Sequence, residues 1–555
     1  MSGVAEPILQ TKLVDLQAQA RRTWNGLERE AIIEIVRSAD YAAYIIHCAS
    51  EAENSLDEAA RDELRLILLG VAPALATFLP LMKGGRGLPF GPATPQTARW
   101  IDQMLFEFGT LARMQRFAAL ERYGLARSEM VDAATIRMEM QAGVGELMDV
   151  HAGRWLTAET KRSVALMQGP PPDNAYIEGL LDATSGVHDG WFIRYEGHPD
   201  ISEAHQQRAV MDVLGCIEAE ALPREAMIGG RPFAEWRAVC ISALERVYNH
   251  VAYASRLMTQ FPGLSIRNLL TVPVLQKDAR AVWIEAGDRP QYASDTISHL
   301  ALDAQSIGPW QHHHEIPAPF YVDVGGGWYL LSLFGGLLNP VCGLVRTLRL
   351  RHTRDWDKAV DRREIYFRED LRNHFGEPRF HVPDHGMTLR REDGSHITDV
   401  DAAILDRETG SLALLQLKWP DIYGMSPKER ESRRLNLLKA NEWVDRVASW
   451  IAGRSARQVA KALGMPDGAS ESKPPILMVI PRYAARFTLN DRLDDRACWV
   501  AWPEVARMRI ENKEAEAPLS ELQREFKSGG SLPPYNRPED FTYKLRGLDV
   551  CVSVL

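Results

Sequence analysis

The chain has 555 residues, which is more than one hydrophobic core usually organises, so we expect two or three domains. Its composition, 45% apolar and 25% charged, is ordinary for a soluble globular protein. The net charge of −9 argues against a protein that coats nucleic acid with its whole surface, although a local basic groove is compatible with it.

Six widely spaced cysteines form no Cys-x-x-Cys pair, which argues against a zinc module or a disulfide scaffold and suits a reducing cytoplasm. The first residues have neither a basic stretch nor an apolar core, so no signal peptide is predicted. Glycine and proline interrupt the apolar stretch at residues 328–345, which disfavours a membrane span there. We therefore expect a soluble, cytoplasmic protein with no membrane partner.

Residues 1–300 are predicted to be helical. Ile32, Val36, Ala39 and Ala43 follow the spacing of one helix face, and similar patterns recur along this region. Breaks rich in glycine and proline, near residues 84–95 and 169–172, allow two subdomains. We expect this region to serve recognition, regulation or oligomerisation, by binding a second copy of the chain or a protein partner.

Residues 301–355 are predicted to connect two domains through a hairpin and a helix. Short aromatic and β-branched runs flank Gly325–Gly327, which indicates a tight turn; the Walker pattern of a phosphate-binding loop is absent. His312, His313 and His314 suggest a metal, but neighbouring side chains of an extended chain point to opposite faces, so a loop cluster is favoured.

Residues 356–510 have the order of an α/β domain. A helix is predicted at 361–375, strands at 379–382, 400–405 and 412–417, a long helix at 426–451, and strands at 476–480 and 498–502. The long connection between strands 412–417 and 476–480 predicts that these two strands are parallel. Residues 511–555 are expected to form a C-terminal tail. The predicted fold class is α+β, with a large helical region followed by a mixed sheet flanked by helices.

Polar residues gather at the ends of two of these strands. Asp401 opens one strand, and Gln416 and Lys418 share a face at the end of the next. Asp401 offers the carboxylate that Mg²⁺ or Mn²⁺ prefers, and Gln416 and the carbonyl of Leu417 offer neutral oxygens. Lys418 is placed to orient a water and to offset phosphate charge. Glu364, on the preceding helix, is a further candidate metal ligand.

Two assignments stay open at this point. Glu369 competes with Glu364 for the helical position, and Asp399 competes with Asp401 for the strand position.

A glutamate on a first helix, an aspartate opening a strand and Gln-x-Lys ending the next resembles the PD-(D/E)XK nuclease superfamily. The glutamine form resembles the methylation-dependent restriction endonucleases of the type IV class. The resemblance rests on Glu364, Asp401, Gln416 and Lys418 and covers about residues 355–505. It implies a restriction-endonuclease-like fold and a metal-dependent nuclease acting on DNA, in bacterial defence or DNA repair.

The alternative is a helical interaction or scaffold protein whose nuclease-like domain binds without cutting. Gln416 is the reason for this alternative, because an amide in place of a carboxylate removes a negative charge from the metal site and should lower its affinity for a metal.

The predicted helix after the site is basic. If it lies beside the site, its cations are suited to contacts with the phosphate backbone of a nucleic acid. The alternative is a solvated face held by ion pairs one turn apart. The candidate nucleic-acid-binding residues are Lys428, Arg430, Arg433, Arg434 and Lys439.

Overall fold

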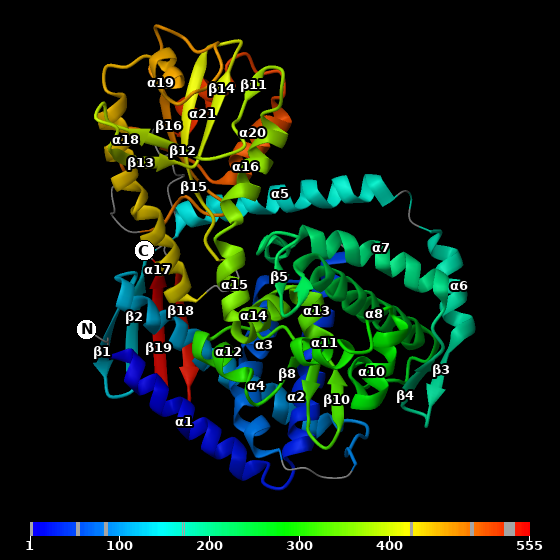
Figure 1. Cartoon of the computed structure of the whole chain (residues 1–555). Coiled ribbons are helices and arrows are strands. Elements are labelled where there is room, and N and C mark those ends of the chain that lie inside the picture. Colours follow the sequence, from blue (N-terminus) through cyan, green and yellow to red (C-terminus); the bar gives the residue numbers. More distant parts are fainter. Residues whose placement is uncertain are drawn as a thin grey trace.

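The computed structural model describes residues 4–51, 56–82, 87–141, 143–168, 170, 172–421, 426–488, 493–526 and 539–554. A large helical body, made of residues 4–360 and 539–554, carries a smaller α/β lobe at residues 363–526 (Figure 1). The α+β class predicted from the sequence is confirmed.

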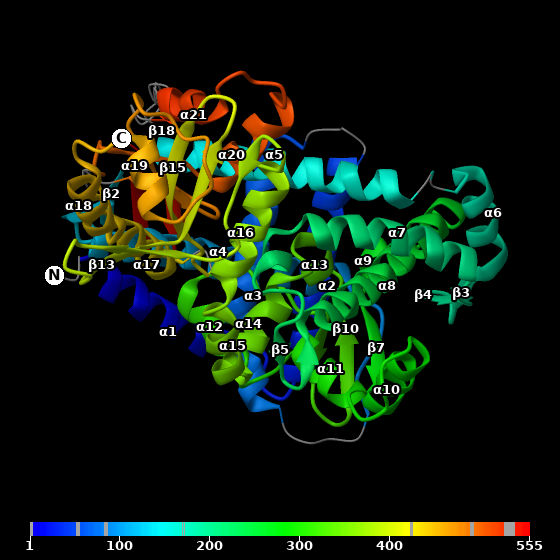
Figure 2. The ribbon, with the colours of Figure 1, turned by 45° about the horizontal axis from the view of Figure 1, so that its top comes forward.

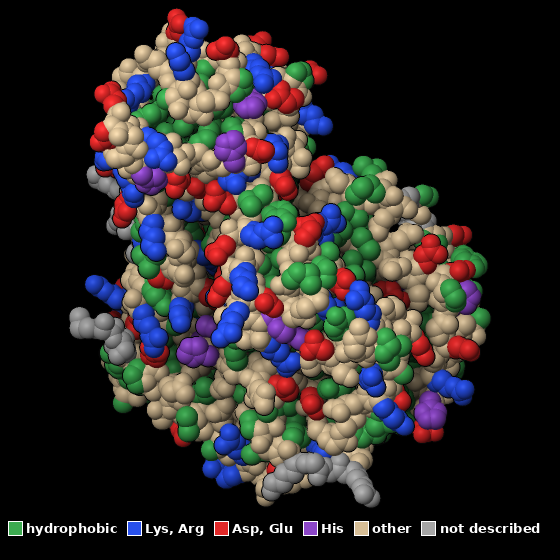
Figure 3. Space-filling view, in the orientation of Figure 1, with side chains coloured by type: hydrophobic (Ala, Val, Ile, Leu, Met, Phe, Trp, Pro, Cys, Tyr) green, Lys and Arg blue, Asp and Glu red, His purple; other side chains and the backbone are tan. Residues whose placement is uncertain are grey.

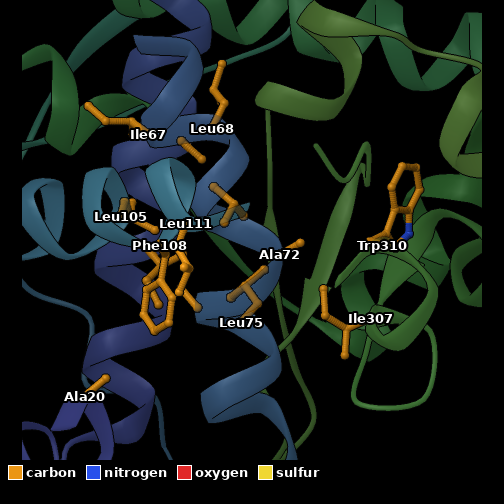
Figure 4. Packing of buried hydrophobic residues seen from close by; sticks show 14 of the residues in the cluster. Ala20, Ile67, Leu68, Ala72, Leu75, Leu105, Phe108, Leu111, Ile307 and Trp310 are labelled. Carbon is orange, nitrogen blue, oxygen red and sulfur yellow. The ribbon is translucent and has the colours of Figure 1, made fainter. Parts of the chain in front are cut away.

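Four long helices build one of the two hydrophobic cores of the body, α1 (Ala5–Thr23), α2 (Glu28–Glu51), α3 (Glu58–Phe78) and α4 (Pro95–Leu120), and the second core forms around α8 (Phe233–Gln260). Phe108 and Leu111 of α4 pack against Leu68 and Leu75 of α3 (Figure 4). Residues 58–81, and not 328–345, form the described helical segment that is long and apolar enough to cross a membrane. Its apolar window is 61% buried inside the protein, as expected for a core helix of a soluble protein.

The remaining elements of the body are mostly short helices. Those up to residue 260 are η1 (Leu79–Leu81), η2 (Glu121–Tyr123), β1 (Ala126–Asp132), β2 (Thr135–Met140), α5 (Val144–Gln168), α6 (Asn174–Thr184), β3 (Ser185–His188), β4 (Phe192–Tyr195), α7 (Pro199–Gly215), η3 (Ile217–Glu220), β5 (Met227–Ile228), β6 (Arg231–Pro232) and α8 (Phe233–Gln260). Those that follow are α9 (Ile266–Leu270), β7 (Val272–Leu275), α10 (Gln276–Glu285), α11 (Ala293–Leu300), β8 (Ala301–Leu302), α12 (Ile307–His313), β9 (Tyr321–Asp323), β10 (Trp328–Leu331), α13 (Phe334–Leu338), α14 (Cys342–Arg351) and α15 (Thr353–Val360).

The hairpin predicted near residue 325 is present as β9 and β10, which pair antiparallel. Gly325, Gly326 and Gly327 form its turn with φ values of 71°, 65° and 83°. Three successive residues with positive φ favour glycine strongly, which explains why this tight turn is Gly-Gly-Gly.

The α/β lobe is built on a five-stranded sheet of order β11-β14-β15-β16-β17. β14 and β15 are antiparallel, and β15, β16 and β17 are parallel, as the long crossover predicts. The elements of the lobe are α16 (Arg363–His374), β11 (Phe380–His381), β12 (Met387–Arg390), β13 (His396–Val400), β14 (Ala402–Asp406), β15 (Ser411–Lys418), α17 (Pro427–Leu438), α18 (Ala440–Ile451), α19 (Ala456–Ala462), β16 (Ile476–Pro481), β17 (Ala497–Trp499), α20 (Trp502–Glu511) and α21 (Pro518–Phe526).

Helices cover both faces of this sheet. Apolar residues of α16, α20 and α21 pack on one face, and those of α18, α19 and the hairpin β12–β13 pack on the other. Side chains alternate along each strand, so the near-continuous apolar run of β15 supplies both cores. The mixed sheet flanked by helices is therefore present.

Three elements of the lobe differ from the prediction. The expected helix at 426–451 is two helices that meet at Lys439, because α18 packs on the sheet while α17 extends to the body (Figure 1). The strand expected at 498–502 ends at Trp499, and Pro503 lies in the first turn of α20. The strand expected at 400–405 begins at Ala402, since Val400 belongs to the separate hairpin β12–β13.

The expected C-terminal tail also contains regular structure. α21 packs on the sheet of the lobe, and β18 (Glu539–Leu545) and β19 (Leu548–Val554) form a hairpin. β19 pairs parallel with β2, so residues 126–140 and 539–554, which are far apart in the sequence, share one sheet of the body. The glycine- and proline-rich stretch at 528–538 lies outside the described residues.

Candidate active site

Asp401 lies at a bend between two strands that belong to different sheets. β13 ends at Val400 and pairs with β12, whereas β14 begins at Ala402 and pairs with β15. The Asp401 N–H donates to the carbonyl of Leu415 at 3.1 Å, which sets Asp401 opposite the end of β15. The bend therefore presents the Asp401 carboxylate at the edge of the sheet.

The structure brings Asp401 and Gln416 together, as the hairpin geometry predicts. Oδ2 of Asp401 accepts a hydrogen bond from Nε2 of Gln416 and another, at 2.7 Å, from the N–H of Leu417. Gln416 is buried, and alternation along β15 puts Lys418 on the same face. Lys418 is half-buried at the end of the strand.

Burial, with the charge of Glu364 as the second cause, raises the pKa of Asp401 to about 6. The N–H of Leu417, the ammonium of Lys418 and the amide of Gln416 act in the opposite direction. Both Glu364 and Lys418 thus lie near enough to Asp401 to interact with its charge. The four residues predicted from the sequence occupy one place in the fold.

Arg368 is a member of this cluster that sequence reasoning missed. Its Nη1 donates to Glu364 at 2.6 Å and to the backbone carbonyl of Asp401 at 2.9 Å, and the side chain is buried. Arg368 follows Glu364 by one helical turn, so the i, i+4 spacing was the available signal. This guanidinium neutralises Glu364 and ties α16 to the bend at Asp401.

The two rival residues lie elsewhere. Glu369 is exposed and pairs loosely with Arg372 at 4.0 Å. Asp399 is on the hairpin β12–β13, where it accepts a hydrogen bond from Thr388 at 2.9 Å and faces His396. The geometry therefore favours Glu364 and Asp401 over these alternatives.

The end of β15 is anchored to the body by Arg482. The N–H of Arg482 donates to the carbonyl of Lys418 at 2.7 Å, and its buried guanidinium forms ion pairs with Glu220 of η3 and Asp370 of α16. The ring centre of Trp419 lies 4.5 Å from the Cζ atom of Arg482, and its Nε1 donates to the hydroxyl of Tyr483. Trp419 therefore packs in the core beside the site. The position of Lys418 is thus linked to the helical body.

The side chains fit a divalent cation in part. Among the described residues, no group of three or more His, Cys, Asp or Glu side chains gathers as a metal site. Asp401 supplies one carboxylate, and Gln416 offers its Oε1 if the amide turns over. Glu364 is already paired with Arg368, which weakens it as a direct ligand. Asp401 and Gln416 are therefore the residues that suit a cation best.

No protein-family model, curated protein or solved structure matches this chain. The resemblance to PD-(D/E)XK nucleases therefore stays a prediction from the sequence.

The basic helix α17 is engaged largely in ion pairs. Arg430 forms a bidentate pair with Glu146 of α5 and donates to the carbonyl of Thr488 at 3.1 Å, while Arg434 pairs with Glu431. Arg433 is half-buried. Only Lys428 and Lys439 of the five candidate residues are exposed. These contacts favour the ion-pair alternative for Arg430 and Arg434 and leave the two lysines available to an anion.

The histidine motifs do not form a metal site among the described residues. His381 pairs with Glu377, and His385 pairs with its neighbour Asp384, so these two histidines engage different partners. His312 and His313 end α12, and His314 caps it in the left-handed region with φ 53°. That conformation is uncommon for a residue other than glycine or asparagine.

Proposed function

We propose that this protein is a cytoplasmic, metal-dependent nuclease that hydrolyses phosphodiester bonds in DNA. The observation that carries the proposal is the hydrogen-bonded group of Asp401, Gln416 and Leu417 at the end of two paired strands, with Lys418 on the same face. A buried carboxylate beside a lysine at a sheet edge suits a cation and a phosphate together. Bacterial defence or DNA repair is the setting that the resemblance suggests.

Each residue has a distinct part in this proposal. Asp401 and Gln416 would hold Mg²⁺ or Mn²⁺, with Glu364 acting through water, and the bound metal would supply Lewis-acid activation of a phosphate oxygen and of water. Lys418 orients the attacking water and offsets the charge that develops on the phosphate. Arg368 keeps Glu364 and the backbone of Asp401 in place.

Cleavage of plasmid DNA in Mg²⁺ or Mn²⁺ tests this proposal. Asp401→Asn and Lys418→Met should each reduce the rate by about 10³-fold, because each removes a charge from the reacting centre. The matched controls are Asp399→Asn and Glu369→Gln, which alter nearby carboxylates outside the cluster and should leave the rate within about 3-fold of the parent. Cleavage that survives in Asp401→Asn and Lys418→Met would refute the site.

A second function is favoured by Gln416 and Arg368. An amide in place of a carboxylate and a guanidinium on Glu364 both lower the negative charge available to a cation. A lobe that binds nucleic acid without cutting it has these properties. DNA binding in a gel-shift assay, with no cleavage in either metal, would support this reading over the first.

A further inference from the structure

A cavity of about 610 Å³ lies where the start of α17 meets the helical body. Its lining comes from α1, α4, α12 and α17, and it includes none of the residues of the candidate active site. Figure 3 shows histidine, lysine and arginine side chains gathered on the surface beside α12. The three consecutive histidines, which have no role in the proposed nuclease, line this cavity.

Four polar side chains of this cavity have no partner among the described residues. His312, His313, His314 and Lys428 form no hydrogen bond or ion pair with the part of the chain that the structure describes. Each neutral imidazole retains one N–H donor, and the lysine ammonium retains three. Several side chains that line the cavity therefore keep hydrogen-bond donors for an acceptor from outside.

Of the charged side chains that line the cavity, Lys428 is a cation with no ion pair among the described residues. Burial, together with the nearby charges of His312 and Arg116, lowers the pKa of His314 to about 4. This imidazole is therefore a neutral hydrogen-bonding group near pH 7. Glu6, the acidic residue in the lining, already forms an ion pair with Arg122 and not with Lys428. An anion in the cavity would offset the positive charge of Lys428.

The other side of the cavity has the features of a site for a polar, planar group. Gln115 donates to Gln10 at 3.1 Å, and this amide pair and Tyr123 line the space. Amides and a tyrosine hydroxyl can donate and accept hydrogen bonds at the edge of a nucleobase. A volume of about 610 Å³ lies in the usual range for sites that enclose a small molecule.

We propose that this cavity binds a phosphate-bearing small molecule of the size of a nucleotide. Lys428 and the histidines contact the phosphates, and Gln10, Gln115 and Tyr123 lie beside the base. Because α17 belongs to the α/β lobe and α12 to the body, the ligand holds the two parts together. This proposal does not rest on nuclease activity.

Isothermal titration of the full chain with ADP, adenosine and inorganic phosphate tests the proposal. ADP should bind one site per chain, and adenosine and phosphate should each bind at least about 10-fold more weakly, because each lacks one half of the contacts. Lys428→Glu and the double variant His312→Ala/His313→Ala should each weaken ADP binding at least 10-fold. Lys461→Glu, the same charge change at an exposed lysine of α19, is the matched control and should bind as the parent does.

Asp401→Asn separates this proposal from the proposed nuclease, because that variant should lose cleavage and keep ADP binding. Lys428 is exposed, so an unchanged melting temperature without ligand will show that its variant is folded. ADP that binds no more tightly than adenosine or phosphate would overturn the proposal. So would full ADP affinity in Lys428→Glu.

Discussion

Asp401 is largely buried, and its charge is therefore costly in the folded protein. The folded pKa is about 6, above the value of 3.8 for the free side chain, so the folded state binds the proton more tightly. The free energy of unfolding should accordingly fall as the pH rises from about 4 to about 6 and stay lower above that range. This pKa shift of Asp401 corresponds to a loss of about 2–3 kcal/mol in the free energy of unfolding above that pH range.

Asp401→Asn should therefore stabilise the protein when no divalent cation is present. At pH 8 in EDTA we expect the variant to unfold with a free energy about 2 kcal/mol higher than the parent, and at pH 5 the gain should be smaller. Urea titrations at the two pH values measure both differences. A variant that is less stable than the parent at pH 8 would contradict the assigned burial cost.

Arg368 controls the charge that Asp401 experiences from Glu364. In Arg368→Met the Glu364 carboxylate loses its partner, so the pKa of Asp401 should rise and the acid limb of the pH–cleavage profile should move to higher pH. Initial rates from pH 5 to pH 9 measure this shift. Arg372→Met, on the same helix but paired only with Glu369, should leave the profile in place; a fall in rate without any shift would show a structural role alone.

Helices α3 and α4 approach closely because glycine faces backbone on both sides. A methyl group on Gly70 would overlap the carbonyl oxygen of Leu105, and one on Gly109 would overlap that of Leu66. Gly70→Ala should separate the helices and lower the unfolding free energy by about 3 kcal/mol. Thermal unfolding measures the loss.

Gly179→Ala in α6 is the matched control, because nothing lies within 4 Å of the added methyl group. It should stabilise the protein by about 0.5–1 kcal/mol through helix propensity. Equal destabilisation in the two variants would show that glycine matters for some reason other than the helix contact.

The sequence predicted those features of the fold that depend on neighbouring residues and on the lengths of connections. The parallel pair β15–β16 and the meeting of Asp401 with Gln416 follow from strand alternation and from the length of the crossover, which are local properties. The ion pair of Arg430 with Glu146 and the partnership of β19 with β2 join residues far apart in the sequence. Periodicity carries no information on such pairings, so the sequence leaves both the nucleic-acid and the ion-pair interpretation of the α17 arginines open.

Helix α5 joins the body to the α/β lobe (Figures 1 and 2). Its Asp149 is buried and accepts hydrogen bonds at 2.8 Å from the N–H groups of both Ala485 and Arg486, and it pairs with the Arg486 guanidinium. Glu504 is the other partner of Arg486, at 3.0 Å. One carboxylate of α5 therefore fixes the segment that follows β16.

Asp149→Ala should loosen the lobe from the body. It leaves two N–H groups and a buried guanidinium short of a partner, which we expect to cost about 3–5 kcal/mol. Calorimetry should show a lower or divided unfolding transition. Glu159→Ala, which breaks only a pair with Arg162 within α5, should change the transition little. A single unfolding transition at the parent temperature in Asp149→Ala would mean that other contacts are enough to hold the lobe on the body.

The pairing of β19 with β2 has a consequence for synthesis on the ribosome. Val550 and Val552 of β19 complete the core around Ile136 and Met138, yet they leave the ribosome after the whole α/β lobe. Until then the body lacks part of its core and exposes one edge of β2. The lobe at residues 363–526 can therefore form its sheet first, and the core of the body is completed only after residues 548–554 have left the ribosome.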